Sequence, residues 1–144
     1  MTGVDQQLDT RDFAAAVAAG LAQSPKVIPA RYFYDQRGSE LFEAITRLAE
    51  YYPTRTEIRL LREHAAEIAQ RCGPGRVVVE FGSGSSTKTP LLLAAVDPAA
   101  YVPIDISADF LAASARNLQA AHPGLDVLPV AADFTRGVDL PARV

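Results

Sequence analysis

Residues 76–89 read RVVVEFGSGSSTKT, an uninterrupted apolar run that leads directly into a glycine-rich turn. A short continuous apolar run is typical of a parallel strand that is buried on both faces of a sheet. The turn contains Gly82 and Gly84. Glycine lets backbone N–H groups approach a ligand without interference from a Cβ atom. The segment therefore predicts a strand, a ligand-binding turn and a helix, in that order.

From Gly73 onward the chain alternates between strand-like and helical segments. Further strands are predicted at AYVPID (100–105) and LDVLPVAAD (125–133). A helix is predicted at PLLLAAV (90–96), and Ser107 is expected to cap the next one. The order β-α-β-α-β is the mononucleotide-binding half of a doubly wound, Rossmann-like α/β sheet. Such units normally continue, so the sequence predicts an α/β fold that is truncated.

The front of the chain, residues 1–72, is predicted to consist of helices and ordered loops. A spacing of four between apolar residues predicts a helix at about 12–22. Ser39 is expected to cap a second helix, and Thr54 with Glu57 forms a capping box for a third. Aromatic residues gather in the loops. They are Tyr32, Phe33, Tyr34, Tyr51 and Tyr52. Core packing explains such residues in one interpretation; in the other, this segment is a lid over residues 73–144.

Composition places the chain among ordinary globular domains. It has 144 residues, of which 49% are hydrophobic and 22% charged, so it is neither disordered nor membrane-like by composition. The net charge is −3 and no basic stripe stands out, which argues against nucleic acid as a partner. The first ten residues, MTGVDQQLDT, have no cationic region or signal-peptide core, so we expect a cytoplasmic protein.

The glycine turn favours one class of cofactor over another. Gly82 and Gly84 occupy the first two positions of G-x-G-x-x-G, but Thr87 occupies the third, which disfavours NAD without excluding it. Glu80, before the turn, instead resembles the first motif of S-adenosylmethionine (SAM)-dependent methyltransferases. Lys88 is either a solvated lysine near the positive end of a helix or a side chain that reaches a carboxylate of the cofactor.

Acidic residues follow the second and third predicted strands. Asp105 lies 21 residues after Gly84, where a carboxylate can hold a ribose diol. Asp133 and Phe134 suit adenine, since the carboxylate accepts from the exocyclic amine and the ring covers a base face. Two alternatives remain open: Asp105 as a helix cap and Asp133 as an ordinary turn residue.

No pattern in the sequence identifies a metal site or a catalytic residue. His64 falls on a predicted surface helix and His122 in a turn that ends a helix, so neither is expected to be catalytic. The sequence has no His/Cys/Asp cluster at ligand spacing, and we predict no metal. The group that accepts a proton from a substrate amine is unknown.

Three motifs together resemble the histidine-specific N-alpha-methyltransferases of ergothioneine biosynthesis. They are FYDQRGSELF (33–42), ITRLAEYYPTR (45–55) and EFGSGSSTKT (80–89), and the similarity runs from about Pro25 to Phe134. The resemblance implies a SAM-dependent enzyme that transfers three methyl groups to the α-amine of L-histidine, giving hercynine.

The same resemblance implies roles for individual residues. It places Tyr51 on the substrate side. With the glycine turn, the predicted cofactor-binding residues are Tyr34, Gly82, Gly84, Lys88, Asp105, Asp133 and Phe134. Ala49 departs from the family pattern, where proline is expected. Family members also continue through further strands and a substrate domain, which carry most contacts to histidine, whereas this chain ends at Val144.

The alternative function is the cofactor-binding half of a split methyltransferase, inactive alone. In the usual strand order the first strand would have an open edge, which self-association or a complementary chain would cover. An interaction module without a ligand is disfavoured, since an empty site has no need for the glycine and aspartate set. We expect a small-molecule substrate, histidine or another amino acid or amine, and neither nucleic acid nor a membrane as partner.

Overall fold

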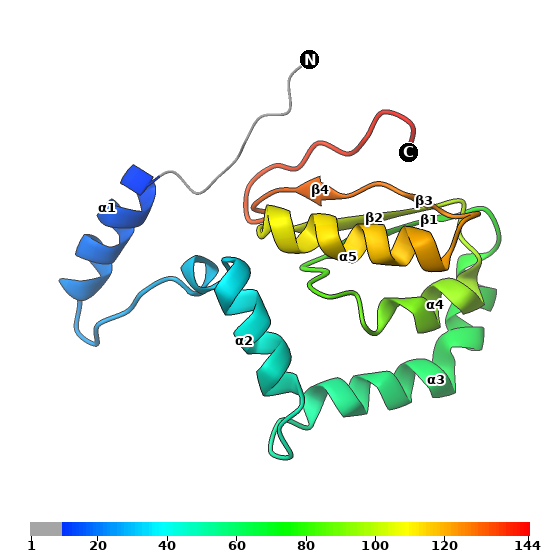
Figure 1. The fold of residues 1–144 in the computed structure, drawn as a ribbon, viewed down its shortest axis with the longest axis horizontal. Coiled ribbons are helices and arrows are strands. Elements are labelled where there is room, and N and C mark those ends of the chain that lie inside the picture. The colour runs from blue at the N-terminus through cyan, green and yellow to red at the C-terminus, as the bar shows by residue number, and fades with distance from the viewer. Residues whose placement is uncertain (1–9) are drawn as a thin grey trace.

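Strand β2 (Ala100–Asp105) lies in the middle of the sheet in the computed structural model, which describes residues 10–144. It pairs in parallel with the full length of β1 (Val77–Phe81). On its other side it pairs, also in parallel, with β3 (Asp126–Val127) and β4 (Val130–Ala131). The fold is therefore a mixed α/β fold built on a parallel sheet, as predicted (Figure 1).

The third predicted strand is divided into two short strands. Pro129 lies between β3 and β4 and has no N–H group to donate to the ladder. The neighbouring residues keep the chain on β2, because Leu128 N donates to Tyr101 O at 2.8 Å and Ala132 N donates to Asp105 O at 2.9 Å. Residues 126–131 therefore run along β2 as predicted, but as two short strands rather than one continuous strand.

Strand β2, rather than β1, is the strand that is buried on both faces. Val102 and Ile104 on one face and Tyr101 on the other are 0% exposed, whereas residues 77–80 of β1 are half-buried and its last residue, Phe81, is 60% exposed. The prediction for RVVVEF was wrong in this respect because β1 has β2 as its single strand neighbour within residues 10–144. Apolar runs in these two strands look alike, and only the sheet order distinguishes them.

Two helices pack on the sheet where the sequence predicted them, although the Ser107 side chain makes no cap bond at the start of the second. Helix α4 (Thr89–Val96) follows the glycine turn, and α5 (Ala108–Ala121) lies along one face of the sheet (Figure 1). Leu93 of α4 and Leu118 of α5 are buried against Tyr101 of β2. This packing holds the turn between β1 and α4 at the carboxyl edge of the sheet.

Residues 10–72 form three α-helices and one short 3₁₀ helix. They are α1 (Thr10–Leu21), η1 (Ala30–Phe33), α2 (Gln36–Thr46) and α3 (Pro53–Cys72). Helix α3 packs against α4, while α1 lies away from the sheet (Figure 1). Within residues 10–144, no helix combines the length and the apolar character needed to cross a membrane.

Both predicted caps in the front segment were wrong. Helix α2 starts earlier, where the side chain of Asp35 accepts from Gly38 N at 2.7 Å, so Ser39 lies inside the helix and is buried. Helix α3 starts after Tyr52 with a proline in its first turn and no side-chain cap. Thr54 therefore lies inside the helix, and Glu57 accepts from Lys88 Nζ at 2.6 Å, an interaction that local sequence does not reveal.

Candidate functional site

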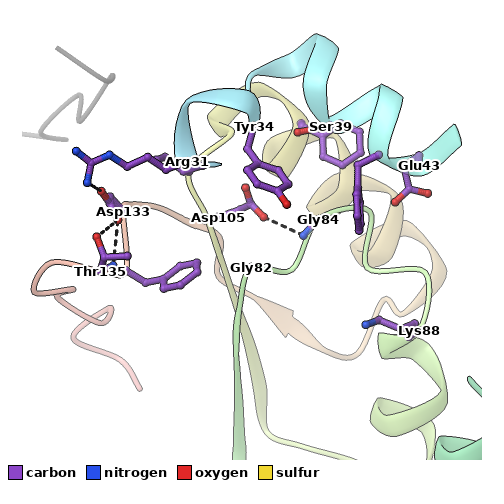
Figure 2. A pocket seen from close by; sticks show the side chains of 14 residues that line it. Arg31, Tyr34, Ser39, Glu43, Gly82, Gly84, Lys88, Asp105, Asp133 and Thr135 are labelled. Atoms are coloured by element: carbon purple, nitrogen blue, oxygen red, sulfur yellow. Dashed lines mark hydrogen bonds and ion pairs between the residues drawn. The ribbon is translucent and has the colours of Figure 1, made fainter. Parts of the chain in front are cut away.

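A cavity of about 460 Å³ lies at the carboxyl ends of β1, β2 and β4. The glycine turn and the strand ends line it from the sheet side, and η1 and α2 line it from the front (Figure 2). Its lining residues are Arg31, Tyr34, Ser39, Phe42, Glu43, Gly82, Gly84, Lys88, Asp105, Ile106, Phe110, Asp133, Phe134 and Thr135. All seven predicted cofactor residues are among them.

The glycine turn has a backbone conformation that favours glycine at two positions. Gly82 and Gly84 have φ angles of 70° and 52°, in the left-handed region that side chains disfavour. A Cβ atom on Gly84 would meet nothing within 4 Å, and one on Gly82 would lie 3.7 Å from the Phe134 ring. The turn is held to β2 because Gly82 N and Ser83 N both donate to Ile104 O, at 2.8 and 3.2 Å.

Asp105 makes structural contacts with both of its carboxylate oxygens. Its Oδ1 accepts from Ser107 N at 3.0 Å, a bond that organises the start of α5. Its Oδ2 accepts from Gly84 N at 2.9 Å, a bond that ties β2 to the glycine turn. Ser107 itself occupies the cap position without a side-chain cap bond. Each carboxylate oxygen accepts more than one hydrogen bond, so Asp105 can also accept from a ligand in the cavity.

Glu80 stabilises the glycine turn through contacts outside the cavity and does not line the cavity. Its Oε2 accepts from Thr89 Oγ1 at 2.7 Å and from the Tyr101 hydroxyl at 2.6 Å, which connects β1 to α4 and β2. The Tyr101 hydroxyl also lies 3.3 Å from Ser86 Oγ. Burial and, secondarily, the hydrogen bond to Glu80 raise the pKa of Tyr101. The motif glutamate is thus a structural residue of the turn.

Asp133 is both a turn residue and part of the cavity wall. Its Oδ1 accepts from Thr135 Oγ1 at 2.6 Å and from Thr135 N at 3.0 Å. Its Oδ2 faces Arg31 Nη1 at 3.7 Å and Arg136 Nε at 4.0 Å. The hydrogen bonds from Thr135, followed by the two guanidinium groups, lower the pKa of Asp133. The carboxylate is therefore ionised and oriented beside the Phe134 ring.

Lys88 and Tyr51 have environments that the sequence did not specify. Lys88 Nζ lines the cavity and donates to Glu57 Oε2 at 2.6 Å, across to α3. Tyr51 does not line the cavity. It packs edge-on against Phe42, at 6.0 Å between ring centroids, and Phe42 packs edge-on against Tyr34 at 6.2 Å. Tyr51 thus reaches the cavity wall through Phe42.

Two charged lining residues were missed by sequence reasoning. Arg31 lies in η1 and its guanidinium faces Asp133 (Figure 2). Glu43 lies on α2, where it follows the lining residue Phe42. Neither has a sequence signal, because an arginine in a loop and a glutamate on an amphipathic helix are ordinary surface residues. Only the fold brings them to the cavity.

The lining combines acidic and basic side chains. The side chains of Glu43, Asp105 and Asp133 outnumber those of Arg31 and Lys88 by one. Aromatic rings and carboxylates together fit a positively charged nucleoside derivative. Within residues 10–144, no group of three or more His, Cys, Asp or Glu residues could hold a metal ion.

Comparison with known proteins identifies a family that matches most of the chain. The profile of a family described as "Histidine-specific methyltransferase, SAM-dependent" matches residues 13–143. A histidine N-alpha-methyltransferase of Mycolicibacterium smegmatis is 44% identical over 122 residues, covering 82% of this chain and 38% of the relative. The chain thus spans well under half of that protein's length.

Two further relatives carry other names. Ergothioneine biosynthesis protein 1 of Neurospora crassa is 42% identical over 91 residues, which cover 60% of this chain and 10% of the relative. A 4-dimethylallyltryptophan N-methyltransferase of Trichophyton verrucosum is 36% identical over 95 residues, which cover 63% of this chain and 28% of the relative.

Proposed function

The chain belongs to the family of histidine-specific, SAM-dependent methyltransferases, and we propose that it serves the transfer of methyl groups from SAM to the α-amine of L-histidine. The observation that carries the proposal is the convergence of all seven predicted cofactor residues on one cavity. Sites for small molecules commonly have volumes of about 300–1,000 Å³. The cavity of about 460 Å³ lies within that range.

The ribose, the adenine and the carboxylate of the cofactor each have a counterpart among the residues that line the cavity. Asp105 would accept from the ribose hydroxyls and Asp133 from the adenine amine, while Phe134 would cover the base. Lys88 would bind the carboxylate of the methionine part, exchanging its contact with Glu57. The open space beside Gly84 lets a ligand approach the backbone of the turn.

The protein's contribution to the reaction is positioning. When bound, SAM would supply an activated methyl group on its sulfonium sulfur, and the lone pair of a neutral amine would form a C–N bond to that methyl as the C–S bond breaks and S-adenosylhomocysteine leaves. Little covalent chemistry is then required of the side chains, and orientation with exclusion of water supplies most of the acceleration. In Figure 2 the Tyr34 side chain extends from the front segment toward Asp105, where it would shield the reacting centre from water.

The finer architecture belongs to the same proposal. Residues 73–144 would be half of a Rossmann-like cofactor domain, and residues 1–72 its lid. The open side of β1 supports the alternative of a cofactor-binding half that another strand completes, from a second copy or a complementary chain. In that case the chain would bind the cofactor without catalysing transfer.

Calorimetric titration with S-adenosylhomocysteine tests the cofactor assignment. Wild-type protein should bind it, and NAD should not displace it. Asp105→Asn should weaken binding about tenfold or more, through loss of a charge-assisted hydrogen bond. Asp109→Asn is the matched control, since Asp109 is exposed on α5 outside the cavity, and should bind like wild type. Absence of wild-type binding would overturn the assignment.

Mass spectrometry with SAM and candidate amines then tests the substrate. Formation of trimethylated histidine would support the main proposal. Methylation of 4-dimethylallyltryptophan instead of histidine would indicate the substrate named for the relative from Trichophyton verrucosum. Cofactor binding with no methylated product would favour the cofactor-binding half.

A further inference from the structure

Glu43 is the one carboxylate of the cavity that the cofactor assignment leaves without a role. Asp133 lies at the Arg31 end of the cavity and Asp105 near its middle, whereas Glu43 lies on the same side as Lys88 (Figure 2). The two side chains enter that end from different elements, Glu43 from α2 and Lys88 from the start of α4. This end of the cavity therefore carries one acidic and one basic side chain.

The contacts of Glu43 leave half of its carboxylate uncommitted. Oε1 accepts from Ser85 Oγ at 2.6 Å, which joins α2 to the glycine turn across 42 residues of sequence. Among residues 10–144, no donor reaches Oε2. Glu43 is half-buried, so an oxygen in this position gains from a cationic partner.

The methionine part of SAM carries opposite charges on neighbouring groups. If Lys88 binds its carboxylate, the α-ammonium must lie within a few bond lengths of that cation and needs an acceptor of its own. Asp105 and Asp133 belong to the nucleoside end of the cavity, and Glu57 lies outside the lining. Glu43 is the acidic side chain that remains.

We propose that Glu43 binds the α-ammonium of the cofactor's methionine part, opposite Lys88. This inference rests on the proposed function. It gives helix α2 a charged contact with the cofactor, because α2 would be joined through Glu43 to the ligand and, through Ser85, to the glycine turn. Glu43 is thereby a residue that selects amino-acid-bearing nucleosides.

Calorimetry with three ligands tests the contact: S-adenosylhomocysteine, its desamino analogue, which keeps the carboxylate, and 5′-methylthioadenosine, which lacks the amino-acid part. Wild type should prefer S-adenosylhomocysteine over the desamino analogue. Glu43→Gln should weaken S-adenosylhomocysteine about tenfold or more and abolish that preference. The affinity of the Glu43→Gln variant for the other two ligands should stay within about twofold of the wild-type affinity. The glutamine can still accept from Ser85, so the tie between α2 and the turn is retained.

Glu40→Gln is the matched control. Glu40 lies on the same helix, accepts from Gln36 Nε2 at 2.9 Å and does not line this cavity. It should bind all three ligands like wild type. Equal loss of affinity for all three ligands in Glu43→Gln would show a purely structural role and overturn the inference, as would an unchanged preference for the amine. Wild-type protein that binds none of them would overturn the proposed function as well.

Discussion

Strand β2 and helix α2 both border the cavity, but they are held in place by different forces. Val102 and Ile104 of β2 are 0% exposed, whereas Leu41 and Ile45 of α2 are 49% and 42% exposed. The sheet side of the site rests on buried apolar area. The position of α2 depends on a few specific contacts, of which the Glu43–Ser85 hydrogen bond is the one to the glycine turn. One wall of the cavity, formed by β2, is thus held in place by the hydrophobic core. The other wall, formed by α2, is held in place by polar and aromatic contacts.

The largest effect should come from truncating the core wall. Ile104→Ala removes a fully buried side chain that packs with Val102 and Leu128, and should lower the free energy of unfolding by about 2–5 kcal/mol. Ile45→Ala, on the exposed face of α2, should cost less than about 1 kcal/mol. Urea denaturation of both variants measures the contrast. Equal losses would show that α2 is buried in solution and would remove the distinction.

An intermediate effect should come from the buried network beneath the turn. Tyr101→Phe removes the hydroxyl that donates to Glu80, and should cost about 1–2 kcal/mol. The pKa of Tyr101 is raised in the folded state, so the unfolded state loses the proton first. Wild-type stability should therefore fall as pH rises above about 10, and the variant should show a shallower fall. Identical alkaline slopes in urea titrations would contradict this assignment.

A smaller effect is expected at the junction of the two walls. Asp133→Asn keeps an acceptor for Thr135 but removes the charge that faces Arg31, and should cost about 1 kcal/mol at neutral pH. The folded-state pKa of Asp133 is lowered, so its contribution is present above the unfolded pKa of about 3.9 and is lost as pH falls through the folded value. The difference between variant and wild type should vanish at low pH. A difference that stays constant down to acid unfolding would rule out the charge as its cause.

The smallest effect should come from the outermost contact of the front segment. Asp12 Oδ2 of α1 pairs with Arg136 Nη2 at 3.2 Å, and both side chains are more than half exposed. Asp12→Asn should change stability by less than about 0.5 kcal/mol, and added salt should reduce even that. Thermal unfolding at two ionic strengths measures it. A loss above about 1 kcal/mol would mean that α1 is fixed more firmly than its exposed contacts imply.

Sequence reasoning predicted the sheet half better than the front half. In the sheet half, strands, helices and turns follow from short-range patterns, and the errors at RVVVEF and at Pro129 concern burial and regularity. In the front half, the three α-helices were predicted, but the 3₁₀ helix η1 was missed and both caps were wrong. Asp35 competed with Ser39, and Glu57 found a partner in Lys88, which lies 31 residues further along the chain.

What the sequence determined by itself is the order of elements from Val77 onward and the identity of the glycine turn. These depend on apolar periodicity and on positive φ angles, which are local properties. Only the tertiary structure decided that β2 is the buried strand, that Glu80 supports the turn from outside the cavity, and that Glu43 and Arg31 enter it. Those outcomes depend on which segments pack together, and short-range patterns carry no information about contacts between distant segments.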